Sequence, residues 1–153
     1  DDMPYPPRPA FKTSLDKRFN SVTYYGFGPY ESYIDKRLAC IKDVYTDTVA
    51  NLEQHYIKPQ ENGSHCGCGF MTISDGTTVV EVTGKDFSFS ALPHSVDEYM
   101  AAKHDCELSE QTETHLCLDL YMSGIGSNSC GPELAERYRA PKEGKGALRL
   151  LVR

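Results

Sequence analysis

The stretch that decides the fold runs from Glu113 to Pro132 and reads Glu-Thr-His-Leu-Cys-Leu-Asp-Leu-Tyr-Met, then Ser-Gly-Ile-Gly-Ser-Asn-Ser-Cys-Gly-Pro. Its first ten residues alternate strictly between apolar and polar positions. One face carries Leu116, Leu118, Leu120 and Met122, and the other carries His115, Cys117, Asp119 and Tyr121. A period of two over this length predicts a half-buried β-strand. Its polar face suits a ligand or a second layer better than bulk water.

The strand leads into a glycine-rich loop that ends at Pro132. Glycine tolerates positive φ and lets a backbone approach another group closely. Loops carried by a rigid sheet are also where functional residues concentrate. A strand followed by an ordinary turn in a β-sandwich explains the same pattern, so the pattern alone leaves both interpretations open.

Length and composition describe one domain, residues 1–153, able to bury roughly 70% of its unfolded surface. No apolar run approaches the roughly 20 residues of a transmembrane helix, and no signal-peptide pattern is visible at the start. The net charge is −6 and the basic residues are scattered, which excludes the electrostatic footprint of a nucleic-acid-binding protein. The six cysteines do not form the pattern of a small disulfide scaffold, and we expect reduced thiols in a cytosolic protein.

Other segments also favour strands, with one helix. Expected strands are 20–25, 78–83, 86–92 and 147–152, with Asp75-Gly76 as a hairpin turn. Residues 38–57 have no clear period and predict loops and short strands. Ser95 and Glu98 form a capping box, which starts a helix that ends near Lys103. The predicted class is mostly β, a two-sheet antiparallel β-sandwich with one short helix near 95–103.

The cysteines offer two chemical interpretations. Cys66 and Cys68 are predicted on one face of a strand beside His65, which could begin a zinc site, although zinc sites usually carry a Cys-x-x-Cys pair. The favoured alternative is that they act as small hydrophobic residues, so we expect no metal and no disulfide. A nucleophilic pair of Cys130 with a histidine has no local sequence support.

Three carboxylates stand in turn-rich segments, namely Glu31, Asp35 and Glu61. Acid–base catalysis needs paired carboxylates in a cleft, so they are candidates for it. The simpler interpretation makes each a structural acceptor for backbone N–H groups or for Arg and Tyr donors.

Four motifs, in order, resemble the C-terminal domain of the large bacterial β-galactosidases of glycoside hydrolase family 2. The first covers residues 25–36 and includes Gly26, Gly28, Pro29, Glu31, Tyr33 and Asp35. The second covers residues 58–63 and includes Pro59, Glu61, Asn62 and Gly63. The others are residues 87–90 and 124–132. The resemblance extends from about Pro4 to Val152.

This resemblance implies the C-terminal part of a galactose-mutarotase-like supersandwich, cut from a longer enzyme that hydrolyses terminal β-D-galactose residues such as those of lactose. The two glutamates of the retaining mechanism lie on an α/β barrel earlier in such enzymes, so no catalytic residue is expected in this chain, which alone should be inactive. The domain supports the barrel and lends a loop, with Asn128, Ser129 and Cys130, to the rim of the pocket. Cys130 stands where well-known members have a tryptophan that stacks on sugar.

The resemblance also implies partners and cofactors. The expected partners are the rest of the enzyme chain, the β-galactoside substrate and further copies of the parent. No nucleic-acid or membrane partner is expected, and the expected location is the cytoplasm. No cofactor is expected in this chain, and the Mg and Na sites of such a parent would lie elsewhere. A free-standing carbohydrate-binding or mutarotase-like module, with the polar strand face as its site, and a purely structural domain are the alternatives. The length of the native gene distinguishes them best.

Overall fold

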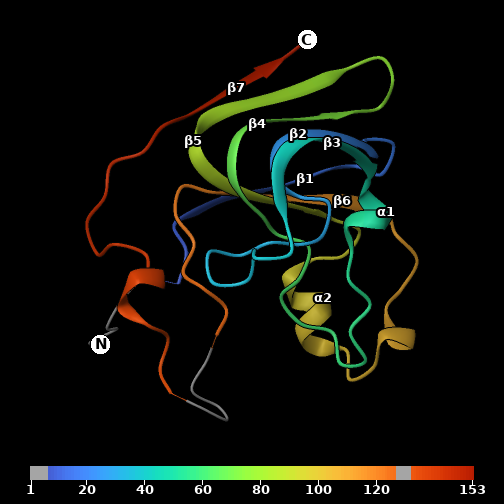
Figure 1. Cartoon of the computed structure of the whole chain (residues 1–153). Coiled ribbons are helices and arrows are strands. Elements are labelled where there is room, and N and C mark those ends of the chain that lie inside the picture. The colour runs from blue at the N-terminus through green and yellow to red at the C-terminus, as the bar shows by residue number, and fades with distance from the viewer. Residues whose placement is uncertain (1–6, 127–131) are drawn as a thin grey trace.

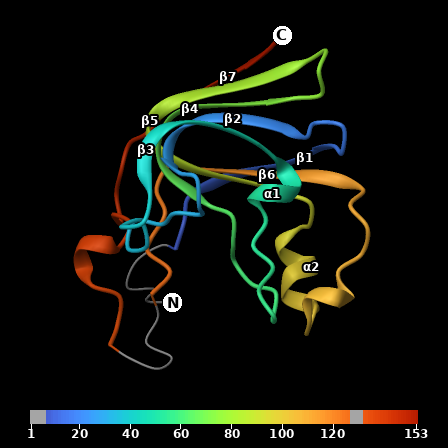
Figure 2. The ribbon, with the colours of Figure 1, turned by 45° about the vertical axis from the view of Figure 1, so that its right-hand side comes forward.

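The computed structural model describes residues 7–126 and 132–153. Within these residues the strands are β1 (Ala10–Asp16), β2 (Ser21–Gly28), β3 (Ile41–Thr48), β4 (His65–Ser74), β5 (Val79–Leu92), β6 (Glu113–Asp119) and β7 (Leu148–Val152). The α-helices are α1 (Val49–Leu52) and α2 (Val96–Ala101), and the 3-10 helices are Asp105–Glu107 and Glu136–Tyr138. None of the described helices is long and apolar enough to cross a membrane. In both views, α2 and the long connections lie on the side of the sheet away from β7 (Figure 1 and Figure 2).

All described strands belong to one antiparallel sheet, in the order β1-β6-β5-β4-β2-β3, with β7 also paired to β5. The long strand β5 pairs with β7 over residues 80–84 and with β6 over residues 88–92. Between these halves Asp86 has a φ of 50°. The predicted mostly β, antiparallel class is confirmed. The structure differs from the prediction of two sheets, because the described strands form one continuous curved sheet (Figure 1).

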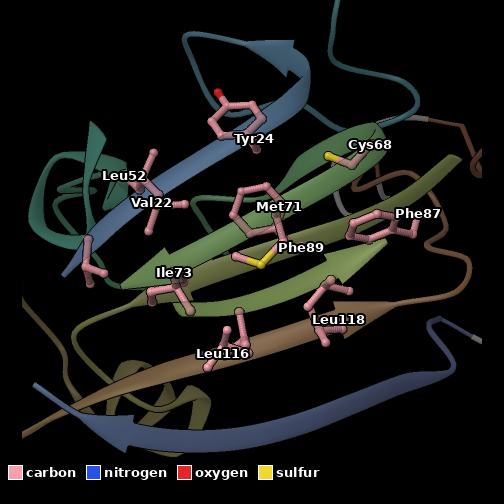
Figure 3. Close-up of a cluster of buried hydrophobic side chains, with 14 residues drawn as sticks. Val22, Tyr24, Leu52, Cys68, Met71, Ile73, Phe87, Phe89, Leu116 and Leu118 are labelled. Carbon is pink, nitrogen blue, oxygen red and sulfur yellow. The ribbon is translucent and has the colours of Figure 1, made fainter. Parts of the chain in front are cut away.

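The core lies in the hollow of this curved sheet (Figure 3). It is built from alternate residues of four strands together with α1: Val22, Tyr24, Val49, Leu52, Cys68, Met71, Ile73, Val80, Val82, Phe87, Phe89, Ala91, Leu116 and Leu118. The alternation predicted for β6 is confirmed, because Leu116 and Leu118 are fully buried in this cluster. Val22 and Tyr24 lie on the core face of β2, within the predicted strand 20–25.

Strand β6 ends at Asp119, three residues before the predicted Met122. After Asp119 the backbone still makes single contacts with the N-terminal segment: Leu120 N–H donates to Pro9 O at 3.1 Å and Ser123 N–H donates to Pro7 O at 2.9 Å. Proline has a carbonyl but no N–H, so it accepts without donating in return. The regular ladder therefore stops where the prolines begin.

The segment 38–57, predicted as loops and short strands, contains the eight-residue strand β3 and the helix α1. Strand β3 is at the edge of the sheet and pairs only with β2. Most of its residues are exposed, so neither face needed to be apolar and no period-two pattern arose. Helix α1 is capped by Thr48, whose hydroxyl accepts from Asn51 N–H at 3.3 Å.

The capping box of Ser95 and Glu98 is present, and α2 ends at Ala101, close to the predicted end. The Asp75-Gly76 turn also joins β4 to β5 as predicted, with Gly76 at a φ of 91°. These local signals were confirmed because each involves groups only a few residues apart.

The prediction that Cys66 and Cys68 share one face of a strand is wrong. The register of β4 against β5 shifts on both sides of Cys68, and Gly67 between the cysteines has a φ of +67°. Such a bulge inserts an extra residue and breaks the alternation of side chains. Cys68 consequently belongs to the core, whereas Cys66 lies beside Ser88, on the outer side of the sheet.

Candidate functional site

Glu31 is the centre of a hydrogen-bond network that joins the first two sequence motifs, residues 25–36 and 58–63. Its side chain is buried, and Oε2 accepts from the backbone N–H of Gly63 at 2.9 Å. Its Oε1 accepts from Lys36 Nζ and Tyr56 Oη. Because a buried carboxylate needs hydrogen-bond donors, these contacts hold the turn after β2 against the segment that leads into β4. A backbone N–H and a tyrosine are among the donors predicted for Glu31, and a lysine donates in addition.

The turn that contains Gly63 is closely packed. Gly63 has a φ of +65°, and a Cβ there would lie 2.6 Å from Leu92 Cδ2 and 2.8 Å from the carbonyl oxygen of Leu52. Both the conformation and the space therefore require glycine. The neighbouring Asn62 is buried, and its Oδ1 accepts from Gln54 N–H at 3.1 Å. The motif 58–63 thus forms a fixed support for Glu31.

The remaining motif residues surround this support. Gly26 and Gly28 lie in β2, a cis peptide bond joins Gly28 to Pro29, and Pro59 is buried. Tyr33 is buried as well, and its hydroxyl has no hydrogen-bond partner among the described residues. Burial raises the pKa of Tyr33 far above its ordinary value.

Asp35 anchors the start of the glycine-rich loop. Its Oδ1 accepts from Ile125 N–H at 3.1 Å, and its Oδ2 accepts from Gly126 N–H at 2.8 Å. A Cβ on Gly124 would lie 2.4 Å from Asp35 Cγ, so only glycine allows this approach. Asp35 was predicted to accept from backbone N–H groups, and these are the N–H groups of the loop.

The other side of the loop base is held by the segment that returns from it. Gly124 N–H donates to Tyr138 O at 2.8 Å, and Ala140 N–H donates to Ser123 Oγ at 2.8 Å. The base is therefore fixed from two directions, by a side chain of the first motif and by the backbone near the last 3-10 helix. The predicted pocket residues Asn128, Ser129 and Cys130 lie outside the described residues.

A second anchor, which sequence reasoning missed, is Arg8. Its Nε and Nη2 donate to the two oxygens of Asp119 at 2.7 and 2.6 Å, and its Nη1 donates to Glu61 at 2.8 Å. Burial opposes the charge of Arg8, but the hydrogen bonds and charge of Asp119 outweigh it and raise the pKa of the guanidinium above its ordinary value. The signal in the sequence was an arginine between Pro7 and Pro9, where the backbone is constrained.

The polar face of β6 borders a cavity of about 310 Å³. His115 and Cys117 line it, together with Ser14, whose Oγ lies 3.2 Å from His115 Nδ1. Burial and the charge of Asp119 raise the pKa of the Cys117 thiol to about 12, so it stays protonated at neutral pH. This face holds hydrogen-bonding groups as predicted, but no activated nucleophile.

No group of three or more His, Cys, Asp or Glu residues is placed to hold a metal ion in the part of the chain that the structure describes. The five described cysteines are free thiols.

A family model described as "Beta galactosidase small chain" matches residues 2–150. The β-galactosidase of Actinobacillus pleuropneumoniae is 41% identical over 138 residues, which are 90% of this chain and 13% of that protein. The β-galactosidase of Staphylococcus xylosus is 44% identical over 137 residues, which are 89% of this chain and 14% of that protein. That of Kluyveromyces lactis is 32% identical over 87% of this chain and 13% of its own length. The resemblance of the four motifs is confirmed, and the chain belongs to the β-galactosidase small-chain family.

Proposed function

We propose that this chain is a non-catalytic domain of a retaining β-galactosidase. In this proposal it supports the catalytic barrel and lends the loop 123–132 to the rim of the galactoside pocket. The relatives support a domain of a larger enzyme over a free-standing sugar-binding module, because the chain spans only 13% and 14% of the first two.

The observation that carries the proposal is the double anchoring of the loop base. Asp35 holds Ile125 and Gly126 from one side, and Tyr138 holds Gly124 from the other. Gly124 must be a glycine because a Cβ there would collide with the Asp35 carboxylate. An ordinary surface turn has no such constraint. Loops set on rigid supports are suited to position a binding residue accurately.

The carboxylates of the motifs are occupied in structural hydrogen bonds, which supports a non-catalytic role. A retaining glycosidase needs two carboxyl groups about 5–5.5 Å apart that both face the sugar. Glu31, Asp35 and Glu61 each accept from donors of this chain instead. We therefore assign the acid/base and nucleophile glutamates to another part of the parent, and we expect the isolated chain to release no nitrophenol from a nitrophenyl galactoside.

At the tip of the loop we assign Asn128, Ser129 and Cys130 to the aglycone side of the pocket. Cysteine is smaller than the tryptophan found there in well-known members, so the rim is wider or is completed by another domain. The homo-oligomer, the cytoplasmic location and Mg and Na sites elsewhere in the parent are parts of the same proposal, and they rest on the resemblance.

The test uses the full-length enzyme that contains this chain. Cys130→Trp and Cys130→Ala should change kcat/KM for lactose and for a nitrophenyl galactoside, and the two substrates should respond differently because their aglycones differ. Cys106→Ala is the matched control, since Cys106 is an exposed free thiol on a separate 3-10 helix. If both Cys130 variants behave as the control does, the loop is not at the site and this assignment fails.

A further inference from the structure

A second cavity, of about 370 Å³, lies beside the anchored loop base. Its walls come from the end of β2 and the turn after it, the start of β4, the middle of β5 and the segment around the last 3-10 helix. Besides Arg139, which pairs with Glu133, two guanidinium groups line it, those of Arg37 and Arg137. They come from segments a hundred residues apart in the sequence.

Both guanidinium groups are positioned by aromatic rings. Arg37 Cζ lies 4.7 Å from the centroid of the Phe27 ring, and Arg137 Cζ lies 4.8 Å from that of Tyr138. Stacking on a ring fixes the plane of a guanidinium and leaves its N–H groups free to donate at the edge. Phe27 and Tyr138 also line the cavity, so they provide apolar walls beside the charges.

These two arginines have no carboxylate partner among the described residues. The ion pairs of the described chain involve Arg8, Arg18, Arg139 and Arg153 instead. The chain carries 22 acidic residues and a net charge of −6. Two cations left unpaired at one cavity of an acidic protein are therefore available to an anion from outside.

Ser88 adds a buried donor. It lies between Phe87 and Phe89, which are core residues, so its side chain faces the other side of β5, toward this cavity. The residue is 6% exposed, and its hydroxyl makes no hydrogen bond with a described residue. As a lining residue of the cavity, Ser88 can donate its hydroxyl to a ligand there.

The chemistry of the lining favours an anion over a neutral sugar. A sugar hydroxyl both donates and accepts, and its sites usually offer carboxylate or amide acceptors. The carboxylate that lines this cavity, Asp86, already faces Lys42 Nζ at 3.5 Å. The unpaired groups are thus donors, and the forked guanidinium matches the two oxygens of a carboxylate.

We propose that this cavity binds a small organic carboxylate, held by Arg37 and Arg137 with a hydrogen bond from Ser88. The aromatic rings contact the carbon skeleton of the ligand. The proposal does not depend on the assignment of the galactoside pocket.

Citrate is the probe, titrated calorimetrically into the full-length protein that contains this chain, at fixed ionic strength because salt screens such contacts. We expect saturable binding that Arg37→Gln and Arg137→Gln each weaken about tenfold or more, which corresponds to about 1.4 kcal/mol. Arg149→Gln is the matched control, because it removes the same charge from an exposed position on β7 that makes no ion pair with a described residue. The neutral ester triethyl citrate should not bind.

Ser88→Ala should weaken citrate binding while leaving the melting temperature of the free protein unchanged, since the hydroxyl has no partner within the described chain. No saturable binding at millimolar citrate would overturn the proposal. So would equal losses in Arg149→Gln and the two cavity variants, which would indicate a general charge effect. Displacement of citrate by galactose would also overturn it, because the cavity would then be a sugar site.

Discussion

Replacing Glu31 by glutamine tests the network that supports the loop. The substitution keeps the shape of the side chain but removes its charge and turns one acceptor into a donor. In the structure three donors face this carboxylate, from Gly63, Lys36 and Tyr56. An amide NH₂ must therefore point at another donor on one side, whichever way it is turned.

The expected loss follows from these contacts. A hydrogen bond to a charged group contributes about 1.5–3 kcal/mol to the free energy of unfolding, and Glu31 is buried, so solvent cannot replace it. For a domain of this size 1 kcal/mol shifts the melting temperature by about 2–4 °C. Glu31→Gln should therefore lower the melting temperature by about 3–12 °C.

The assay is thermal unfolding followed by circular dichroism, in parallel with Glu110→Gln. Glu110 is exposed and makes no hydrogen bond with a described residue, so the same chemical change there should alter the free energy of unfolding by less than about 0.5 kcal/mol. If the two variants melt at the same temperature, Glu31 is effectively solvated and the reasoning about the network is refuted.

Two further predictions concern the loop base and a buried histidine. Gly124→Ala places a Cβ 2.4 Å from Asp35 Cγ, so the loop must shift. The kcat/KM of the full-length enzyme should therefore fall about tenfold or more. Unchanged kinetics would mean that the position of the loop does not affect turnover. His65 packs against the rings of Tyr24 and Phe89, and burial lowers the pKa of its imidazole to about 4. As the pH falls, this histidine takes up a proton in the unfolded state before it does so in the folded state. The free energy of unfolding that depends on the neutral imidazole is therefore fully present above pH 6.5 and is lost as the pH falls toward 4. Urea midpoints measured from pH 7 to pH 4 should fall less steeply for His65→Phe than for the unsubstituted chain, and identical slopes would contradict this account.

The sequence by itself determined the features that depend on near neighbours. The alternation of Leu116 and Leu118 placed β6 against the core, because side chains of a strand point to opposite faces in turn. The capping box of Ser95 and Glu98 started α2 through groups three residues apart. Four motifs also identified the family, because they occur in the order and spacing of its members.

The tertiary structure alone decided which distant groups meet. Asp35 accepts from backbone groups 90 and 91 residues later, and Arg8 pairs with Asp119, 111 residues away. No periodicity encodes such pairings, because they follow from the order of strands and the curvature of the sheet. The sequence did not reveal the bulge at Gly67 for the same reason. Whether a glycine in a strand takes positive φ depends on the register of the partner strand. The bulge then places Cys66 on the side of the sheet opposite to Cys68.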